Sequence, residues 1–460
     1  MFREGRLTYF LAFLAGAGLN LSFAPFEIFL LLILTLGGFY QLLEGAKTAK
    51  QAAKISFVFG FGFYLCGLFW IANSFFERGG AFVYMAPIAV IGLPLILALY
   101  FVALGCLYFK IKQYSSFFRP IIFALLWTVM EYAKAHILTG FPWNMLAYTA
   151  LAKIQIAQAA YYIGPYLLSG VICLITIIPD YIINNYKHRS TLWFYIILQL
   201  CMAVSLLWGG AKHIENTTSQ NYKVAVVQPN IAQADKLNPN RKVHIFAQTI
   251  NALKQVKPDA ELVILPEAAI PYFLDKNANI RNELVKHVPN NSHLIVGGLR
   301  YEGKNYNSLK MYNSLFIINK KAQIVAIYDK NHLVPFGEYV PLSNILPIQK
   351  LTAGMTDFEA GKPTNNLQAG GINIKPLICY EVIFSELANN SNSDVIVNIT
   401  NDAWFGRTIG PHQHLAAAKM RAIENRKILY RSANTGISAI INPNGVVEKS
   451  LPTGAFGVIQ

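Results

Sequence analysis

Three residues of reactive type each end an apolar run in the second half of the chain. Glu267 ends LVILPE, Lys330 ends IVAIYDK and Cys379 ends IKPLIC. A thiol has an ordinary pKa of about 8.5, so it must lose its proton before it becomes a strong nucleophile. A carboxylate can take that proton, and an ammonium can stabilise an oxyanion. These three types together could attack a carbonyl carbon.

The elements that must position these residues are predicted β-strands in an α/β domain. Helical patterns at 244–256 and 414–430 separate some of the strands. Because open α/β sheets form their sites outside the carboxyl ends of strands, we expect the three residues to converge there. The predicted strands are 222–230, 261–267, 292–299, 313–319, 322–330, 372–379 and 393–402.

Each of the three residues also has an ordinary structural explanation. A single glutamate or lysine at a strand end is often a solvated turn residue, and a lone cysteine often fills a core. Only their joint placement favours a site, to which the backbone N–H of Tyr380 could add a second oxyanion donor. Cys379 has no disulfide partner in its half of the chain, because the other cysteines lie in the first half, at Cys66, Cys106, Cys173 and Cys201.

Charge divides the 460 residues into two parts. Residues 1–210 hold 13 Lys/Arg and 6 Asp/Glu, whereas residues 211–460 hold 26 and 18. This contrast predicts a transmembrane domain over 1–210 and an extramembrane domain over 211–460. The net charge of +15 comes without a basic run or a binding motif, so we expect no nucleic-acid partner.

Seven segments are long and apolar enough to suggest membrane helices. Arg3 and Arg6 before the first segment would also fit a signal peptide, but further apolar spans follow at once and favour an uncleaved helix. The segments lie at about 8–25, 26–43, 55–76, 82–109, 118–138, 161–183 and 192–209.

Loop charges predict the orientation of these segments, because cytoplasmic loops are enriched in Lys and Arg. The loops on the N-terminal side carry 10 such residues, among them Arg3, Lys50 and Lys187. The opposite loops carry only Arg78, Lys134 and Lys153. We therefore expect a cytoplasmic N-terminus and an exported second half.

Several motifs resemble the Glu-Lys-Cys segments of the nitrilase, or carbon-nitrogen hydrolase, superfamily. With two further segments, 138–149 and 413–440, the chain resembles the apolipoprotein N-acyltransferase family over nearly its whole length. This resemblance implies a polytopic α-helical membrane domain followed by an α/β nitrilase-like domain, an αββα sandwich. The superfamily motifs are LVILPEAAIP (262–271), YDKNHLVPFGEYVP (328–341), ICYEVIF (378–384) and NDAWFG (401–406).

The resemblance also implies roles for individual residues. Glu267 would be the base, Lys330 the stabiliser of oxyanion and intermediate, and Cys379 the nucleophile. Glu338 would orient Lys330 or assist proton transfer, although a simple salt bridge would explain it as well. Tyr380 and Glu381 would shape the pocket. The candidates for substrate binding are Trp404, Phe405 and Trp143, for which aromatic core packing is an alternative.

The implied activity is that of a membrane-bound N-acyltransferase. Cys379 would take an acyl chain from a phospholipid as a thioester and pass it to the α-amine of an N-terminal diacylglyceryl-cysteine on a lipoprotein. The implied location is a bacterial inner membrane, with the catalytic domain in the periplasm. No cofactor or metal is implied, and His412 and His414, without a supporting cluster, are expected to be structural.

Three positions depart from the family pattern. Leu237 follows Lys236 where a tryptophan is common, which puts an aromatic lid contact in doubt. Lys134 stands where arginine is usual, which would lose bidentate phosphate recognition. The family usually closes with another membrane helix, whereas this chain stops at GAFGVIQ, so we expect a truncated chain or a fragment.

Two other functions are open to such a chain. A membrane-anchored nitrilase-type amidase would hydrolyse small amides and would need water rather than lipid at its site. A transporter or receptor would need ionisable residues within its spans, for which Glu131 is the main candidate. Retention of Glu267, Lys330 and Cys379 together argues against a domain that only binds.

Overall fold

The chain forms two compact units in a computed structural model. One unit comprises Met1–Ala72 and Met85–Thr217, and the other comprises Asn73–Tyr84 and Thr218–Gln460. The domain boundary expected at 210/211 stays a prediction. The structure describes residues 5–113, 116–185, 189–215, 222–303, 309–341, 343, 350–352, 356–363, 366–389 and 392–460.

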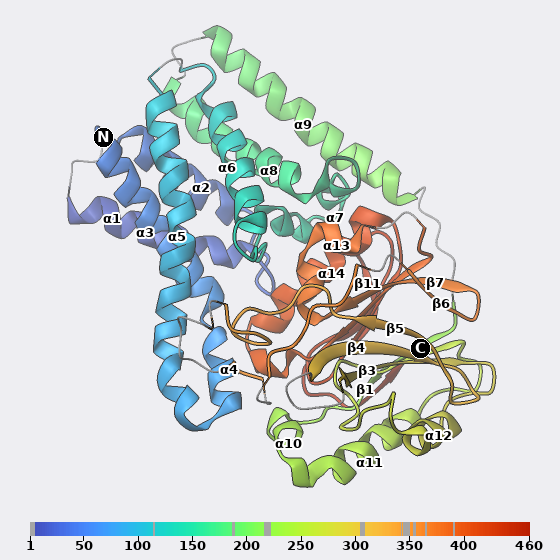
Figure 1. Cartoon of the computed structure of the whole chain (residues 1–460). Helices are drawn as coiled ribbons and strands as arrows, with labels where there is room; N and C mark the ends of the chain where they lie inside the picture. The colour runs from blue at the N-terminus through green and yellow to red at the C-terminus, as the bar shows by residue number, and fades with distance from the viewer. Residues whose placement is uncertain are drawn as a thin grey trace. The chain divides into compact units, whose positions relative to one another are not determined.

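The first unit is helical throughout its described part (Figure 1). Two features of the sequence mark helix starts: Thr48 accepts a hydrogen bond from the backbone N–H of Gln51 at the start of α3, and prolines occupy the first turns of α5 and α6. Its helices are α1 (Arg6–Leu19), α2 (Leu31–Glu44), α3 (Ala49–Leu68), α5 (Ala86–Ile111), α6 (Arg119–His136), α7 (Ile154–Ala157), α8 (Ala160–Asn185) and α9 (Arg189–Glu215), with short 3-10 turns η1 (Asn20–Ser22) and η3 (Leu146–Ala152).

Each of the seven predicted apolar segments overlaps one of the long helices. Among the described residues, four stretches are long and apolar enough to cross a membrane: Ala49–Leu68, Gly80–Ile111, Ala160–Asn184 and Arg189–Glu215. Helices α1 and α2 have only 14 residues each, and α6 has 18. Seven crossings therefore stay a prediction. Arg3 and Lys187, two of the residues that support the predicted orientation, lie outside the described residues.

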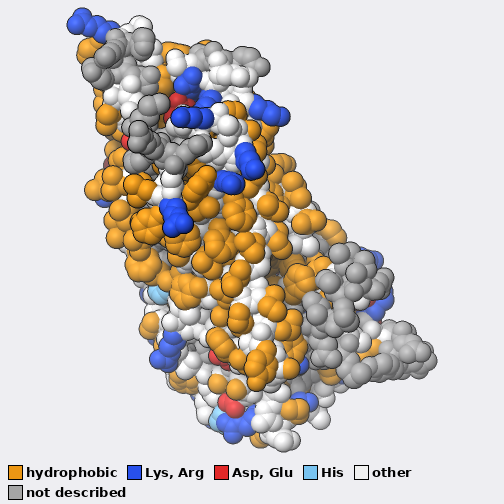
Figure 2. All heavy atoms as spheres, turned by 90° about the vertical axis from the view of Figure 1, so that its left-hand side faces the viewer, with side chains coloured by type: hydrophobic (Ala, Val, Ile, Leu, Met, Phe, Trp, Pro, Cys, Tyr) orange, Lys and Arg blue, Asp and Glu red, His pale blue; other side chains and the backbone are white. Residues whose placement is uncertain are grey.

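The outer surface of this unit is apolar. Figure 2 shows one face on which hydrophobic side chains predominate. The exposed side chains include Phe10 and Leu14 of α1, and Ile91, Ile96 and Leu99 of α5. Exposed apolar surface on this scale is costly in water and stable in lipid.

The segment predicted at 55–76 is not one helix. Helix α3 ends at Leu68, and a second helix, α4 (Ile71–Arg78), begins after Trp70. The indole N–H of Trp70 donates to the carbonyl of Gly67 at 3.1 Å, which satisfies a carbonyl that the ending helix leaves unpaired. The prediction missed this break because hydrophobicity continues across it.

The second unit contains two six-stranded sheets, which confirms the α/β sandwich that the resemblance implied. The sheet orders are β12-β1-β2-β3-β4-β5 and β11-β10-β9-β8-β7-β6. Each has a parallel centre, β1-β2-β3 in one and β7-β8-β9 in the other, flanked by antiparallel strands. The strands are β1 (Val224–Gln228), β2 (Leu262–Ile264), β3 (His293–Glu302), β4 (Lys310–Ile318), β5 (Ile324–Asp329), β6 (Leu367–Ala369), β7 (Ile372–Ile378), β8 (Val395–Thr400), β9 (Leu429–Ala433), β10 (Ser438–Ile441), β11 (Val447–Leu451) and β12 (Gly457–Ile459).

The alternation of side chains along the strands builds two apolar cores. Ile264 of β2 and Ile378 of β7 belong to the core that both sheets share. Val263, the residue before Ile264, points the other way, into a second core with Leu253 of α11 and Leu284 of α12. The helices of this unit are α4, α10 (Gln233–Leu237), α11 (Lys242–Leu253), α12 (Ala278–Lys286), α13 (Ser385–Ala388) and α14 (Gly410–Asn425), with 3-10 turns η2 (Gly80–Met85), η4 (Pro239–Arg241), η6 (Cys379–Ile383) and η7 (Asp402–Phe405).

The helix predicted over 414–430 is wrong at its C-terminal end. Helix α14 ends at Asn425, because Arg426 takes a left-handed conformation with φ of 52° and its N–H caps the last turn. The next residues form strand β9, which pairs with β8 and β10. Arg431 consequently lies in the middle of a sheet rather than after a helix.

Candidate active site

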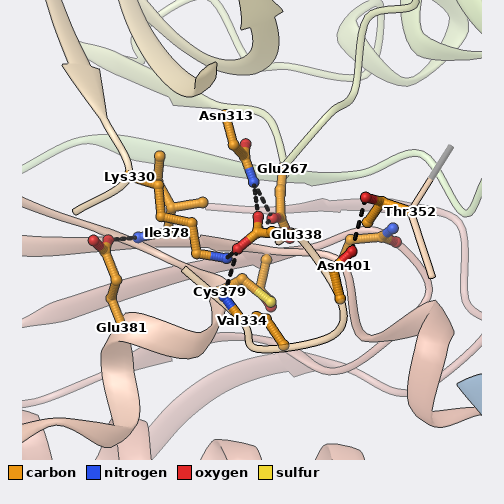
Figure 3. A network of polar contacts seen from close by, with 12 residues as sticks. Glu267, Asn313, Lys330, Val334, Glu338, Thr352, Ile378, Cys379, Glu381 and Asn401 are labelled. Atoms are coloured by element: carbon orange, nitrogen blue, oxygen red, sulfur yellow. Dashed lines mark hydrogen bonds and ion pairs between the residues drawn. The ribbon is translucent and has the colours of Figure 1, made fainter. Parts of the chain in front are cut away.

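The two sheets bring the three predicted residues together. Glu267 follows β2 and Lys330 follows β5, both in one sheet, whereas Cys379 follows β7 of the other sheet. Figure 3 shows the side chain of Cys379 beside the ends of Lys330, Glu338 and Glu267. The carboxyl ends of strands from two facing sheets therefore meet at this site.

Lys330 lies between two carboxylates. Its Nζ is 2.9 Å from Oε2 of Glu338 and 3.9 Å from Oε1 of Glu267, and its side chain is only 1% exposed. Burial disfavours the charge, but the carboxylates of Glu338 and Glu267 outweigh burial and raise the pKa of Lys330. Lys330 is therefore a permanent cation in the site. The ion pair expected for Glu338 is present, while its part in proton transfer stays a prediction.

Asn313 of β4 holds both carboxylates in place. Its Nδ2 donates to Oε1 of Glu267 at 2.7 Å and to Oε1 of Glu338 at 2.9 Å. The backbone N–H of Val334 donates to the other oxygen of Glu338 at 2.8 Å. Two amide hydrogens on one nitrogen thus fix the spacing of two like charges. Sequence reasoning missed Asn313, whose one visible signal is a polar amide shortly before the apolar run at 315–318.

Glycine at 297 lets the backbone of Glu267 lie close to strand β3. A Cβ at this position would come within 2.5 Å of the carbonyl oxygen of Pro266 and 2.6 Å of Cα of Glu267. The backbone of Gly297 also exchanges hydrogen bonds with this turn, receiving one from the N–H of Ala269 and donating one to Pro266. The position of the predicted base thus depends on the missing side chain.

Cys379 is a buried, neutral thiol at rest. Burial raises the pKa of its thiol, and the charge of Glu267 raises it further, while Lys330 acts in the opposite direction. The thiol is therefore protonated at neutral pH. Attack by this sulfur requires a base. The carboxylate of Glu267 is close enough to raise the pKa of the thiol, and it is the candidate for that base.

A second lysine adds positive charge to the site. Lys236 of α10 donates from Nζ to the backbone oxygen of Glu267 at 3.2 Å. Burial lowers the pKa of Lys236 to about 8, against the opposing effect of Glu267 and Cys379. With Lys330 it balances the two carboxylates, Glu267 and Glu338. The neighbouring Leu237 is partly buried, and the lid contact that it puts in doubt stays a prediction.

Glu381 ties together the two segments that carry Lys330 and Cys379. Its Oε1 accepts from the hydroxyl of Tyr328 at 2.8 Å and from the backbone N–H groups of Asn331 at 2.7 Å and His332 at 3.1 Å. Its Oε2 accepts from the backbone N–H of Ile378 at 2.7 Å. This fully buried carboxylate with four donors links the segments that follow strand β5 and end strand β7, and its pocket-shaping role stays a prediction.

We expect Glu381→Gln to destabilise the protein. The amide keeps the size of the side chain, but its NH₂ group cannot accept, so at least one buried donor loses its partner at a cost of about 1–3 kcal/mol. The melting temperature should fall measurably. Glu448→Gln is the matched control, because Glu448 is exposed and such changes usually stay within about 0.5 kcal/mol. Equal melting of both variants would contradict the bracing role.

Comparison with known proteins gives a match to each half of the chain. Residues 15–178 match the apolipoprotein N-acyltransferase N-terminal domain, and residues 223–460 match the carbon-nitrogen hydrolase family. The solved structure of Saccharomyces cerevisiae Nit3, a nitrilase-superfamily member, is 19% identical with a TM-score of 0.39 and covers 52% of this chain and 91% of that one.

Curated relatives extend the match to the whole chain. The apolipoprotein N-acyltransferase of Rickettsia prowazekii is 33% identical over 463 residues, which cover 98% of this chain and 91% of the relative. That of Rhodopseudomonas palustris is 32% identical over 475 residues, 98% and 88% of the two chains. The chain belongs to the apolipoprotein N-acyltransferase family. Together with the four apolar helices, this membership makes it a membrane protein and an N-acyltransferase.

Three further residues that the resemblance singled out, Tyr380, Trp404 and Phe405, lie in different surroundings from one another. Tyr380 is buried against Phe384, with ring centroids 5.2 Å apart. Phe405 meets the ring of His414 edge-on at 5.6 Å, and the backbone oxygen of Trp404 accepts hydrogen bonds from Asn73 and Ser74. Trp404 and Phe405 are partly buried. Their place on an acyl path, like the pocket-shaping role of Tyr380 and its N–H as an oxyanion donor, stays a prediction.

Two candidate residues of the first unit lie in its interior. Trp143 is 3% exposed and packs between Phe141 and Trp70. Lys134, which departs from the arginine expected from the resemblance, is 2% exposed and donates to the backbone oxygen of Trp143 at 2.9 Å. Lys134 thus braces the backbone of the segment that carries Trp143, and a substrate contact of Trp143 stays a prediction.

The histidine pair divides between two environments. His412 is partly buried, whereas His414 is fully buried, with Nδ1 2.9 Å from Oδ1 of Asp402 and Nε2 3.2 Å from the carbonyl oxygen of Cys379. Within the described residues, no group of three or more His, Cys, Asp or Glu side chains could hold a metal. The ring nitrogens of His414 lie close to Asp402 and to the backbone of Cys379, a placement that the spacing of two histidines does not reveal.

Proposed function

We propose that this protein transfers an acyl chain from a phospholipid to the α-amine of a lipoprotein's N-terminal diacylglyceryl-cysteine, by way of a thioester on Cys379. The observation that carries the proposal is that one chain joins a match to the apolipoprotein N-acyltransferase N-terminal domain with a match to the carbon-nitrogen hydrolase family. The carbon-nitrogen hydrolase match alone would also fit the amidase alternative. The N-terminal domain match and the full-length relatives do not favour that alternative.

In the first half-reaction the sulfur of Cys379 attacks the ester carbonyl while Glu267 takes the thiol proton. The new C–S bond puts negative charge on the carbonyl oxygen, which Lys330 stabilises. The ester C–O bond then breaks, and the leaving oxygen takes the proton back from Glu267. The products are a lysophospholipid and an acyl thioester on the enzyme.

In the second half-reaction the amine of the acceptor attacks the thioester. An α-amine with a pKa near 8 must lose a proton as it bonds to carbon, and Glu267 can take that proton. The C–S bond breaks and the thiolate of Cys379 is protonated again. The amide product leaves, and the site returns to its resting charge.

Purified protein given a phospholipid and a diacylated lipopeptide tests the proposal. Mass spectrometry should find the lipopeptide heavier by one acyl chain and an equal amount of lysophospholipid. Release of free fatty acid, with the lipopeptide unchanged, would instead show that the thioester is hydrolysed. A protein that hydrolyses small amides and leaves both lipids unchanged would support the amidase.

We further propose a bacterial inner-membrane location with residues from about 211 in the periplasm. The support is the excess of Lys and Arg in loops on the N-terminal side of the predicted spans. A reporter that is active only outside the cytoplasm should be active when fused after residue 220 and inactive when fused after Lys50. Cytoplasmic behaviour of the fusion after residue 220 would place the catalytic half on the wrong side of the membrane for exported lipoproteins.

A further inference from the structure

A second polar cluster lies next to the backbone of Cys379. It includes none of the three residues of the proposed mechanism. It consists of Thr400, Asp402, His414 and Arg431, each no more than 1% exposed. They come from four elements: the end of β8, turn η7, helix α14 and strand β9. So many buried polar groups at one point need an explanation beyond packing, because each must find hydrogen-bond partners.

The partners within the cluster converge on Asp402. Its Oδ2 accepts from Nη2 of Arg431 at 2.6 Å, and its Oδ1 accepts from the hydroxyl of Thr400 at 2.9 Å and lies 2.9 Å from Nδ1 of His414. Burial opposes ionisation, but the charge of Arg431 and the hydrogen bond from Thr400 outweigh it and lower the pKa of Asp402. Asp402 is thus a fixed anion that orients Thr400 directly, and Nη2 of Arg431, which it binds, also lies 3.1 Å from Nδ1 of His414.

Two connections run from this cluster to Cys379. The Nε2 of His414 lies 3.2 Å from the carbonyl oxygen of Cys379, and because a carbonyl can only accept, this nitrogen carries the hydrogen. Cys379 and Thr400 directly follow Ile378 and Ile399, which pair in strands β7 and β8. The Thr400 hydroxyl favours the ionised form of the neighbouring Cys379 side chain. The backbone and the side chain of the same residue are therefore both linked to the cluster.

The backbone of Cys379 needs such support. Its φ is 51°, in the left-handed region that residues other than glycine rarely occupy. A strained conformation persists only where neighbouring groups fix it, and His414 holds the carbonyl that follows this φ. The contacts of the cluster thus fix the backbone of Cys379, which sets the direction in which its sulfur points.

We propose that Thr400, Asp402 and His414 are positioning residues that hold Cys379 in its left-handed conformation and stabilise its thiolate. This inference rests on the proposed role of Cys379 as nucleophile. When the S–H bond breaks, the proton goes to Glu267, and the hydroxyl hydrogen of Thr400 turns from Asp402 to the sulfur anion. Once the C–S bond forms, that hydrogen returns to Asp402, which keeps its bonds from Arg431 throughout.

The hydroxyl of Thr400 can be removed with almost no change of shape. Thr400→Val should slow acylation of Cys379 by phospholipid, measured as the single-turnover release of lysophospholipid, by roughly 10-fold or more, as expected for loss of a hydrogen bond to a charged group. Thr400→Ser restores the hydroxyl and should recover most of that rate. KM for phospholipid should stay the same, because Thr400 is fully buried and is proposed to act on the sulfur rather than on the lipid.

A chemical readout reports on the sulfur without any lipid. Alkylation of Cys379 by iodoacetamide, a neutral reagent, should slow in Thr400→Val, and its pH dependence should move to higher pH. The matched control is Thr176→Val, because Thr176 is also buried and its hydroxyl bonds to the backbone oxygens of Ile172 and Cys173 in its own helix, both at 2.9 Å. This control should alkylate and acylate at the parent rates.

His414 gives an independent test should Thr400→Val fold poorly. His414→Gln places an amide N–H where it can reach the carbonyl of Cys379, whereas His414→Leu removes the donor. The glutamine variant should therefore acylate faster than the leucine variant at similar melting temperatures, and equal rates in the two would contradict the role of His414.

The outcomes separate this inference from the function on which it rests. If Cys379→Ala transfers acyl chains at the normal rate, the proposed nucleophile is wrong and the positioning role falls with it. If Cys379→Ala is inactive while Thr400→Val matches the parent in both acylation and alkylation, only the positioning role is wrong.

Discussion

Replacing Cys379 with alanine should lower acyl transfer by roughly 10⁴-fold or more, the scale on which enzymes lose their nucleophile. The expectation follows from its position beside Glu267 and Lys330, where a neutral, buried thiol has both a base and a cation at hand. Nothing else in the proposed mechanism can hold the acyl chain between donor and acceptor. The variant should stay folded, because the substitution removes one sulfur atom.

The covalent intermediate gives this prediction a direct measurement. Phospholipid alone should yield one equivalent of lysophospholipid and an acyl mass on the peptide that contains Cys379, which hydroxylamine releases. Cys379→Ala should give neither product. Glu267→Gln should slow both formation and discharge of the adduct, since one base serves both steps. An adduct that never forms without the acceptor would contradict the two-step mechanism.

Replacing Lys330 with methionine should lower the rate by about 10²-fold or more, the typical loss when one oxyanion donor is removed. Lys330→Arg should not recover it fully, since a planar guanidinium does not fit the place of an ammonium between two carboxylates. The single substitution has a second effect, because it leaves Glu267 and Glu338 as buried like charges. Breaking a buried ion pair in this way costs about 3–5 kcal/mol, so the melting temperature should fall as well.

A double variant separates catalysis from stability. Lys330→Met with Glu338→Gln removes one charge of each sign and leaves Asn313 in place to bond both neighbouring oxygens. The melting temperature should rise back toward that of the parent, while the rate should stay at least about 10²-fold lower. Recovery of both properties would mean that Lys330 is only a counter-ion.

The sequence was sufficient to predict that Glu267, Lys330 and Cys379 would lie close together. Each of Glu267, Lys330 and Cys379 follows a short apolar run, and strand ends are where α/β folds place their sites. The resemblance also predicted the two-layered sheet, which hydrophobic periodicity alone does not distinguish from a single buried sheet. Local signals and family motifs were enough, because the reactive groups sit directly at the ends of the elements that those signals define.

The supporting residues could not be predicted in the same way. Asn313 and Glu381 act through contacts 46 and 53 positions along the chain, with Glu267 and Tyr328 respectively. The predicted helix over 414–430 left Arg431 outside any predicted element, whereas the left-handed turn at Arg426 ends the helix early and Arg431 lies in strand β9 next to β8. Such partners depend on how distant segments pack, and no local pattern of hydrophobicity records that.

The short segment Asn73–Tyr84 affects where the chain can be divided into separately expressed fragments. It belongs to the unit that contains the two sheets, although it lies between stretches of the helical unit in the sequence, and its Asn73 and Ser74 donate to the backbone oxygen of Trp404 at 3.2 and 3.0 Å. A gene fragment that begins at residue 218 would express the sheets without these two donors. Soluble fragments, the parts used in split-gene complementation, and chimaeras of related proteins should therefore contain residues 73–84 together with the C-terminal half.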